Sequence, residues 1–185
     1  HKGCKSVCLT ENFAACLTAK YCLGCFCSSD VDISADPGEA SKIRDVLHEL
    51  GYIRVSRRLY RSKVYQDEYI CPVDIGEQFY INIAWQPVIR ERVFTIDQRL
   101  VAAWMRNQRR AANCYETTAI RIMRPEATLV HCVYHMSVGH YYCASPGIRL
   151  LTEVDRIIRC CSLDWDEIKR YARELKIEKR MYIAM

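Results

Sequence analysis

Cysteines near the start of the chain are the residues whose type and spacing most clearly predict chemistry. Cys4 and Cys8 form one close pair, and Cys22 and Cys25 form a second. Two close thiolate pairs are typical of a structural zinc site, because a tight turn can present two sulfurs to one tetrahedral ion. Metal binding would also supply folding energy to a segment without a clear apolar pattern. The sequence therefore predicts a zinc knuckle within residues 1–30, with zinc as cofactor.

The same cysteines could instead form disulfides, since the chain has 12 of them, an even number. A chain of 185 residues, half of them hydrophobic, can bury a core without cross-links. No Asn-X-Ser/Thr glycosylation site occurs in it. We therefore expect zinc, and an intracellular, reducing compartment. The first residue, His1, predicts a processed or trimmed chain.

A second group of residues could supply a thiol nucleophile and its base. The segment Asn113-Cys114-Tyr115 and the segment Gly139-His140-Tyr141 resemble the catalytic cysteine and histidine segments of papain-like viral leader proteases. The resemblance implies cysteine protease activity behind an N-terminal zinc finger, with Cys114 as nucleophile and His140 as base. Cys71 is the alternative nucleophile and His135 the alternative base. The competing interpretation is that these cysteines are small buried hydrophobes.

Three histidines follow closely in the chain, at positions 131, 135 and 140. On the strands predicted here, His131 and His135 share a face but lie too far apart to bind one ion. His135 and His140 could approach each other across a turn and form half a metal site, or a base with its orienting partner. Ordinary half-buried histidines are the alternative.

Basic and tyrosine side chains alternate along one predicted hairpin. Arginines at alternate strand positions project from one face, and tyrosines between them offer stacking surfaces for RNA bases. The same residue types are enriched in protein interfaces, and a solvated sheet face is the third interpretation. The sequence predicts a docking site for a protein complex, with RNA as a second candidate partner. The residues of this site are Arg54, Arg57, Arg58, Tyr60, Arg61, Lys63 and Tyr65.

Local signals predict the elements that would position these residues. Capping residues predict four helices, which start near Asp36, Thr95, Ser145 and Asp164. Alternating apolar residues predict strands within 53–55, 59–65, 69–75, 79–85, 117–123, 128–136 and 140–144. The apolar end, 181–185, predicts an edge strand or a buried plug. We therefore expect an α+β fold, in which an antiparallel sheet of five to seven strands packs with four helices over residues 37–185, behind the zinc knuckle.

Composition and missing motifs narrow the function. The net charge of +5 is spread along the chain and indicates no polyanion-binding tail. No apolar stretch is long enough to cross a membrane. No P-loop or dinucleotide fingerprint occurs, which argues against most nucleotide-handling enzymes, and no carboxylate pair stands out for acid–base catalysis. The sequence predicts a non-enzymatic interaction or assembly protein with a structural zinc, and the alternative is the papain-like thiol protease.

Overall fold

The strands form one mixed sheet. The computed structural model describes residues 4, 7–19, 30–60, 63–72, 79–85, 108–111, 119–140, 142 and 144–185. Its strands are β1 (Cys8–Leu9), β2 (Asp30–Ser34), β3 (Ile53–Tyr60), β4 (Lys63–Cys71), β5 (Phe79–Ala84), β6 (Gln108–Ala111) and β7 (Ala119–Ile122). Their order is β3-β4-β5-β2-β1-β7-β6, so β2 is central. The pairs β2/β5 and β1/β7 are parallel and the other neighbours are antiparallel.

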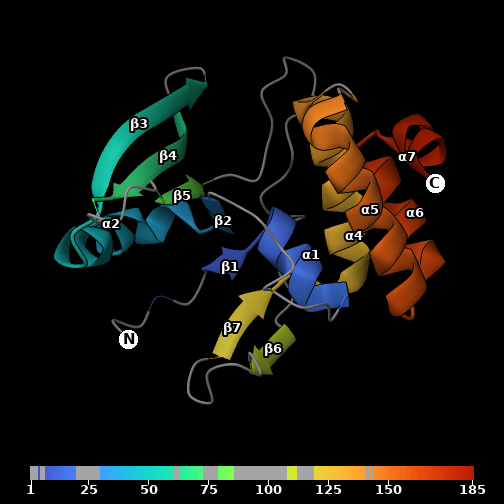
Figure 1. Cartoon of the computed structure of the whole chain (residues 1–185), viewed down its shortest axis with the longest axis horizontal. Coiled ribbons are helices and arrows are strands. Elements are labelled where there is room, and N and C mark those ends of the chain that lie inside the picture. Colours follow the sequence, from blue (N-terminus) through green and yellow to red (C-terminus); the bar gives the residue numbers. More distant parts are fainter. Residues whose placement is uncertain are drawn as a thin grey trace.

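Six α-helices accompany this sheet among the described residues: α1 (Glu11–Ala19), α2 (Ala40–Glu49), α4 (Pro125–Tyr134), α5 (Ala144–Cys160), α6 (Trp165–Glu174) and α7 (Glu178–Ala184). A 3-10 turn, η2 (Pro37–Glu39), precedes α2, and a π-helical turn, η3 (His135–Gly139), follows α4. Figure 1 shows α2 beside β2–β5, and α1 gathered with α4–α7 on the other side. No described helix is long and apolar enough to span a membrane. The predicted α+β class is confirmed, whereas the sheet is mixed and not purely antiparallel, and the described part of the chain has six α-helices where four were predicted.

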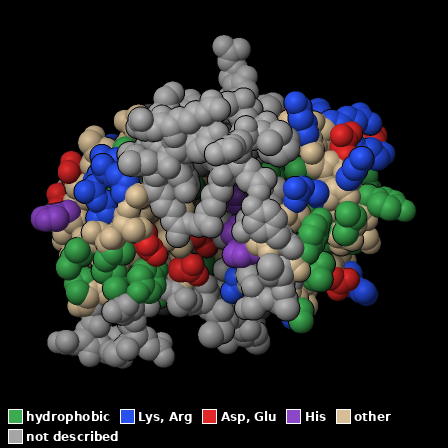
Figure 2. Space-filling view, turned by 90° about the horizontal axis from the view of Figure 1, so that it is seen from above, with side chains coloured by type: hydrophobic (Ala, Val, Ile, Leu, Met, Phe, Trp, Pro, Cys, Tyr) green, Lys and Arg blue, Asp and Glu red, His purple; other side chains and the backbone are tan. Residues whose placement is uncertain are grey.

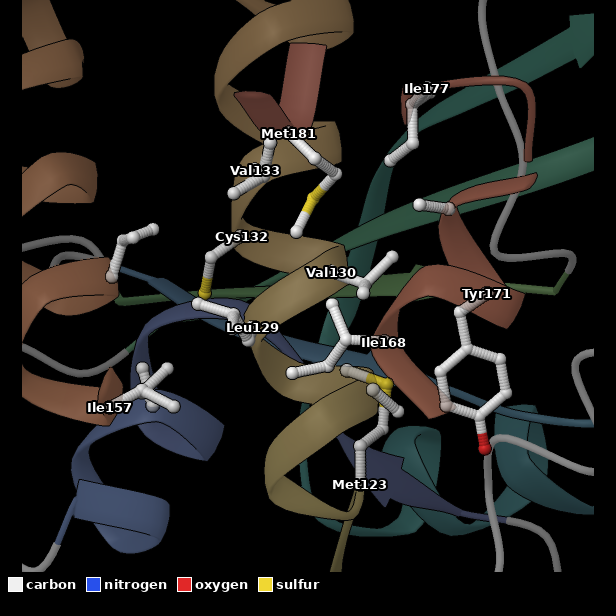
Figure 3. Close-up of a cluster of buried hydrophobic side chains, with 14 of the residues drawn as sticks. Met123, Leu129, Val130, Cys132, Val133, Ile157, Ile168, Tyr171, Ile177 and Met181 are labelled. Carbon is white, nitrogen blue, oxygen red and sulfur yellow. The ribbon is translucent and has the colours of Figure 1, made fainter. Parts of the chain in front are cut away.

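The larger hydrophobic core lies around α4. Leu129, Val130 and Val133 of this helix are fully buried, and they pack with Ile157 of α5 and Ile168 of α6. Figure 3 shows these side chains directed toward one another from neighbouring helices. Burying apolar side chains of this size contributes about 1.5–3 kcal/mol each. Apolar burial therefore holds the helical half together.

A smaller core holds α2 against the sheet. Ile43 and Leu47 of α2 pack on Ile83 of β5 and on Trp85, which follows that strand. Since strand side chains alternate between the two faces, this core occupies one face of β2, β5 and β4 and leaves their other face for polar residues. That second face carries the candidate site described below.

Capping signals correctly predicted two helix starts. The Asp36 side chain accepts a hydrogen bond from the Gly38 amide at 2.7 Å, and α2 follows within one turn. Asp164 accepts hydrogen bonds from the amides of Asp166 and Glu167 at the start of α6. These signals act within a few residues of the chain, so they do not depend on tertiary contacts.

The segment 128–136 is helical, contrary to the strand predicted there. α4 begins at Pro125, which suits a first helical turn because the N–H that proline lacks would have no helical acceptor. Residues 126–130 are all buried, so no polar stripe marks the segment as a helix. The β-branched Thr128 and Val130 favour strands locally. Burial among α1, α5, α6 and α7 overrides that preference.

Three further predictions about elements are wrong where the structure describes them. Within 140–144, His140 lies in a bend and α5 begins at Ala144. The apolar end belongs to α7, which buries Met181 and exposes Tyr182 and Ile183, as one face of a helix does. The helix predicted to start near Thr95 was expected to run to about residue 111. Its described part is strand β6, and the remainder lies outside the described residues.

The predicted zinc knuckle is not found in the described part of residues 1–30. Cys8 lies in β1, which pairs with both β2 and β7. The next element, α1, buries Ala15 and Ala19 in the larger core. Sheet pairing and apolar burial therefore position the described parts of this segment. Cys22 and Cys25 lie outside the described residues.

Candidate functional site

Two aspartates project from the same face of the central strand. Asp30 and Asp32 are two positions apart on β2, so their side chains share a face. The parallel partner strand β5 places Asn82 directly opposite Asp32. The Asn82 Nδ2 donates hydrogen bonds to Asp30 Oδ2 and to Asp32 Oδ1, each at 3.1 Å. Two carboxylates thus converge on one nitrogen atom in a half-buried position.

This polar face continues across two more strands. Glu68 of β4 lies opposite Asn82, and Ser56 of β3 lies opposite Glu68. The Ser56 hydroxyl donates a hydrogen bond of 2.6 Å to Glu68 Oε2. Asp32, Asn82, Glu68 and Ser56 therefore form a row across β2, β5, β4 and β3, which we call the polar row. Figure 2 shows acidic and histidine side chains near the middle of one face of the molecule, with basic side chains to either side.

Behind Glu68, on the opposite face of β4, a buried carboxylate fixes the strand. Asp67 is fully buried and accepts hydrogen bonds from Arg57 Nε at 2.9 Å and from Trp85 Nε1 at 2.9 Å. The Arg44 side chain of α2 adds a longer contact of 3.4 Å and lies over the Trp85 ring. Two cations and an indole N–H compensate for the desolvation of this carboxylate. Asp67 therefore ties β3, β4 and α2 together directly behind the polar row.

The side chains that meet at Asn82 have a chemistry that suits a hard divalent cation. Such cations prefer oxygen ligands, and carboxylates contribute both ligand atoms and neutralising charge. Asp30 and Asp32 supply two carboxylates, and Asn82 could turn its amide oxygen, instead of its nitrogen, toward a cation held between them. Among the described residues, no three His, Cys, Asp or Glu side chains cluster in a way that could hold a metal. The donor set of this site is thus two carboxylates with one amide.

The three histidines meet on the helical side of the molecule. The Nε2 atoms of His135 and His140 lie 2.9 Å apart, so one nitrogen donates and the other accepts. The rings of His131 and His135 stack at 6.4 Å. The predicted separation of His131 and His135 was wrong because a helix, unlike a strand, brings positions i and i+4 to one face. His135 and His140 do approach each other, as predicted, but a helical turn brings their rings together and not the turn between two strands.

The cysteines proposed for catalysis or metal binding are scattered in the described structure. Cys4 is half-buried and Cys8 is buried, with its Sγ 3.4 Å from the Leu9 carbonyl. Cys71 is a half-buried free thiol at the end of β4, next to Tyr52, whose pKa is raised first by burial and then by Cys71. Cys114 lies outside the described residues. No described cysteine forms a disulfide.

The predicted basic hairpin exists as β3 and β4, which pair from Ile53 and Ile70 to Tyr60 and Lys63. The strand predicted over 59–65 is therefore two strands. Arg57 binds Asp67, and Arg54 is exposed. Arg61 and the side chains of Arg58, Tyr60, Lys63 and Tyr65 lie outside the described part of the chain. A partner for this surface remains a prediction.

The carboxylate pair on β2 was missed by sequence reasoning, which took residues 28–36 for a polar boundary. The signal that marks it is the alternation Asp30-Val31-Asp32-Ile33, in which carboxylates and apolar residues share one short strand. Such alternation places both carboxylates on one face and both apolar side chains on the other. Asn82 carries a comparable signal, since it interrupts the apolar strand 79–84.

Comparisons with known proteins bear on this site. A family described as "Uncharacterised nucleotidyltransferase" matches residues 23–185. No curated protein sequence matches the chain. Among solved structures, the lincosamide antibiotic adenylyltransferase LnuA with lincomycin bound is similar, with a TM-score of 0.53, 13% identity, and coverage of 84% of this chain and 87% of that chain. The antibiotic-resistance factor ANT(2'')-Ia has a TM-score of 0.51, 12% identity, and coverage of 91% and 84%. At these identities the likeness is one of fold.

These matches contradict the function predicted from sequence. Neither a non-enzymatic zinc protein nor a papain-like protease agrees with the family match over 23–185. A structural zinc has no support among the described residues, and the family match gives no support to RNA binding. The argument against nucleotide-handling enzymes was also wrong. It considered glycine-rich phosphate loops, whereas a carboxylate pair on a strand can hold a nucleotide's phosphates through a cation.

Proposed function

Because the chain belongs to a family of uncharacterised nucleotidyltransferases, we propose that it transfers a nucleoside monophosphate from a nucleoside triphosphate to a hydroxyl group of an acceptor. The observation that carries the proposal is the convergence of Asp30 and Asp32 on Asn82 at the centre of the sheet. In this reaction the acceptor oxygen forms a bond to the α-phosphorus. The bond from that phosphorus to the β-phosphate oxygen breaks, and pyrophosphate leaves.

Mg²⁺ is the cofactor that we propose for this site. Asp30 and Asp32 would hold it, and the Asn82 amide would turn its oxygen toward it. When bound, a divalent cation neutralises phosphate charge and orients the triphosphate. Asp30 and Asp32 lie on β2, which has a hydrogen-bonded neighbour on each side, so the carboxylates keep their positions without a loop having to order around the nucleotide.

The acceptor is proposed as a hydroxyl compound without a further name. Lincomycin, the ligand in the LnuA structure, is a rational first compound to test. Water serves as a second acceptor, because its attack on the α-phosphorus gives the nucleoside monophosphate and pyrophosphate. The same measurement, pyrophosphate release, therefore covers both acceptors.

The experiment measures binding before turnover. Each of ATP, GTP, CTP and UTP is titrated into the protein by calorimetry, with Mg²⁺ and with EDTA, and pyrophosphate release is then followed. We expect at least one nucleotide to bind with Mg²⁺ and not with EDTA, and D30N and D32N each to lower turnover by about 100-fold or more. D155N, an exposed change on α5, is the matched control. Failure of all four nucleotides to bind to the folded wild type would overturn the proposal.

A further inference from the structure

The proposed reaction needs a group that takes the proton from the acceptor hydroxyl. Asp30 and Asp32 are committed to the cation in the function proposed above, on which this inference rests. Asn82, the next residue in the polar row, has an amide side chain, which does not take up a proton near neutral pH. The proton acceptor must therefore come from farther along the polar row or from outside it.

Glu68 follows Asn82 in the polar row, and its side chain is a carboxylate, which can accept a proton. It lies on β4 directly opposite Asn82, on the same face as Asp32. Adjacent strands are about 4.8 Å apart, so the backbones at Glu68 and Asp32 are separated by about 10 Å. The side chains at both ends extend from the same face, so an α-phosphate and an attacking hydroxyl bound over Asn82 would lie between the two carboxylates.

Ser56 gives the Glu68 carboxylate a defined orientation. Its hydroxyl donates to Oε2 at 2.6 Å, and this is the hydrogen bond that the described residues make to the Glu68 side chain. Within the described part of the chain no hydrogen bond to the second oxygen, Oε1, is seen, and Oε1 is the atom that would meet a hydroxyl of the acceptor. Asp67, held on the opposite face by Arg57 and Trp85, fixes the backbone of β4 at this point. The carboxylate is thus positioned by its own strand and by the neighbouring one.

We propose that Glu68 is the catalytic residue that accepts the proton, with Ser56 as its positioning residue. The acceptor oxygen forms its bond to the α-phosphorus while its proton moves to Glu68 Oε1. The bond between that phosphorus and the β-phosphate oxygen breaks, and its electrons leave with pyrophosphate. Glu68 then returns the proton to solvent, so no oxidant or further reactant is required.

The test uses wild type, E68Q, E68D, S56A and the double variant S56A/E68Q, with ATP or whichever nucleotide the wild type binds, and with water as acceptor. General base catalysis contributes about 10²–10⁴-fold, so we expect E68Q to lower kcat by about 100-fold with nucleotide affinity changed by less than about twofold. E68D keeps the carboxylate and should recover part of kcat. The control E178Q changes an exposed glutamate on α7 and should leave kcat unchanged.

The double variant separates positioning from folding. S56A alone should lower kcat by about fivefold, because it removes one hydrogen bond to a charged group. In the E68Q background the same change should have no further effect on kcat, since Ser56 acts through the carboxylate. Melting temperatures measured on the same samples show whether each variant is folded. A loss of kcat by S56A that persists undiminished in the E68Q background would overturn the positioning role.

Three outcomes distinguish this proposal from the proposed function. If the wild type binds no nucleotide, the proposed function fails, and the role of Glu68 with it. If the wild type turns over and E68Q or E68D, whichever folds, turns over equally fast, Glu68 is not the proton acceptor although the function stands. If E68Q instead raises the Mg²⁺ concentration required and keeps its maximal kcat, Glu68 is a cation ligand, and the proposal is overturned.

Discussion

Asn82 lies between two carboxylates and donates to both, with its amide nitrogen 3.1 Å from Asp32 Oδ1 and 3.1 Å from Asp30 Oδ2. Like a cation, the amide group places positive charge where two negative groups meet, although its charge is only partial. An aspartate at the same position would add a third negative charge. The effect of that change depends on whether a divalent cation is bound.

The variant N82D should make the stability of the protein depend on Mg²⁺. Without a cation, three carboxylates repel one another, and we expect the melting temperature to fall by several degrees, which corresponds to about 1–2 kcal/mol. Adding excess Mg²⁺ should raise the melting temperature of N82D by more than it raises that of the wild type. N82A, which removes both hydrogen bonds and adds no charge, is the control. Equal Mg²⁺ responses of N82D and N82A would contradict a cation site at Asp30 and Asp32.

Asp67 should be among the costliest polar residues to remove. Its buried carboxylate is compensated by Arg57 and Trp85 at 2.9 Å each. The variant D67A leaves these donors without their acceptor, so we expect the free energy of unfolding to fall by about 3 kcal/mol. Urea denaturation measures this change. E68A on the same strand alters a half-buried side chain and should lower the free energy of unfolding by clearly less. A similar decrease in both variants would contradict the stabilising role of the buried Asp67 carboxylate.

Asp164 caps α6 and also joins it to α4. Its side chain accepts from two amides at 3.0 and 3.1 Å, while its own amide donates to Glu126 Oε1 at 3.1 Å. The variant D164A removes the cap and should lower the free energy of unfolding by about 1 kcal/mol. D164N keeps an acceptor and should recover most of this loss. D155A, which removes an exposed i,i+4 ion pair with Arg159, should cost about 0.5 kcal/mol or less.

Tyr171 should make stability fall at alkaline pH. Burial first, and then a hydrogen bond to Glu167, raises its pKa from 10.0 to about 12. In the unfolded chain this tyrosine loses its proton near pH 10, so the unfolded state binds fewer protons than the folded state between pH 10 and about 12. The stabilisation present below pH 10 is therefore lost progressively across that range.

The comparison with Y171F isolates this tyrosine from the others that titrate at high pH. The free energy of unfolding of the wild type should fall more steeply than that of Y171F between pH 10 and about 12, as measured by urea denaturation at several pH values. The two proteins should show parallel curves below pH 9 or so. Parallel curves across the whole alkaline range would contradict the raised pKa.

Some elements could be predicted because their signals are local. Asp36 and Asp164 each cap amides two or three residues further on, so a short stretch of sequence holds the complete signal. The strand over 79–85 was predicted from its alternating apolar residues, and β5 lies there. Helix α4 could not be predicted in this way, because burial on nearly every side removes the periodic pattern that identifies a helix.

The sequence by itself determined which side chains of β2 share a face, since the alternation in Asp30-Val31-Asp32-Ile33 follows from the geometry of a strand backbone. Only the tertiary structure decided that β5 is the parallel neighbour of β2, and so that Asn82 meets the two aspartates. Alternation specifies a face and carries no information about the partner strand. Parallel neighbours are joined by a long connection, and their pairing depends on the packing of the whole sheet with its helices.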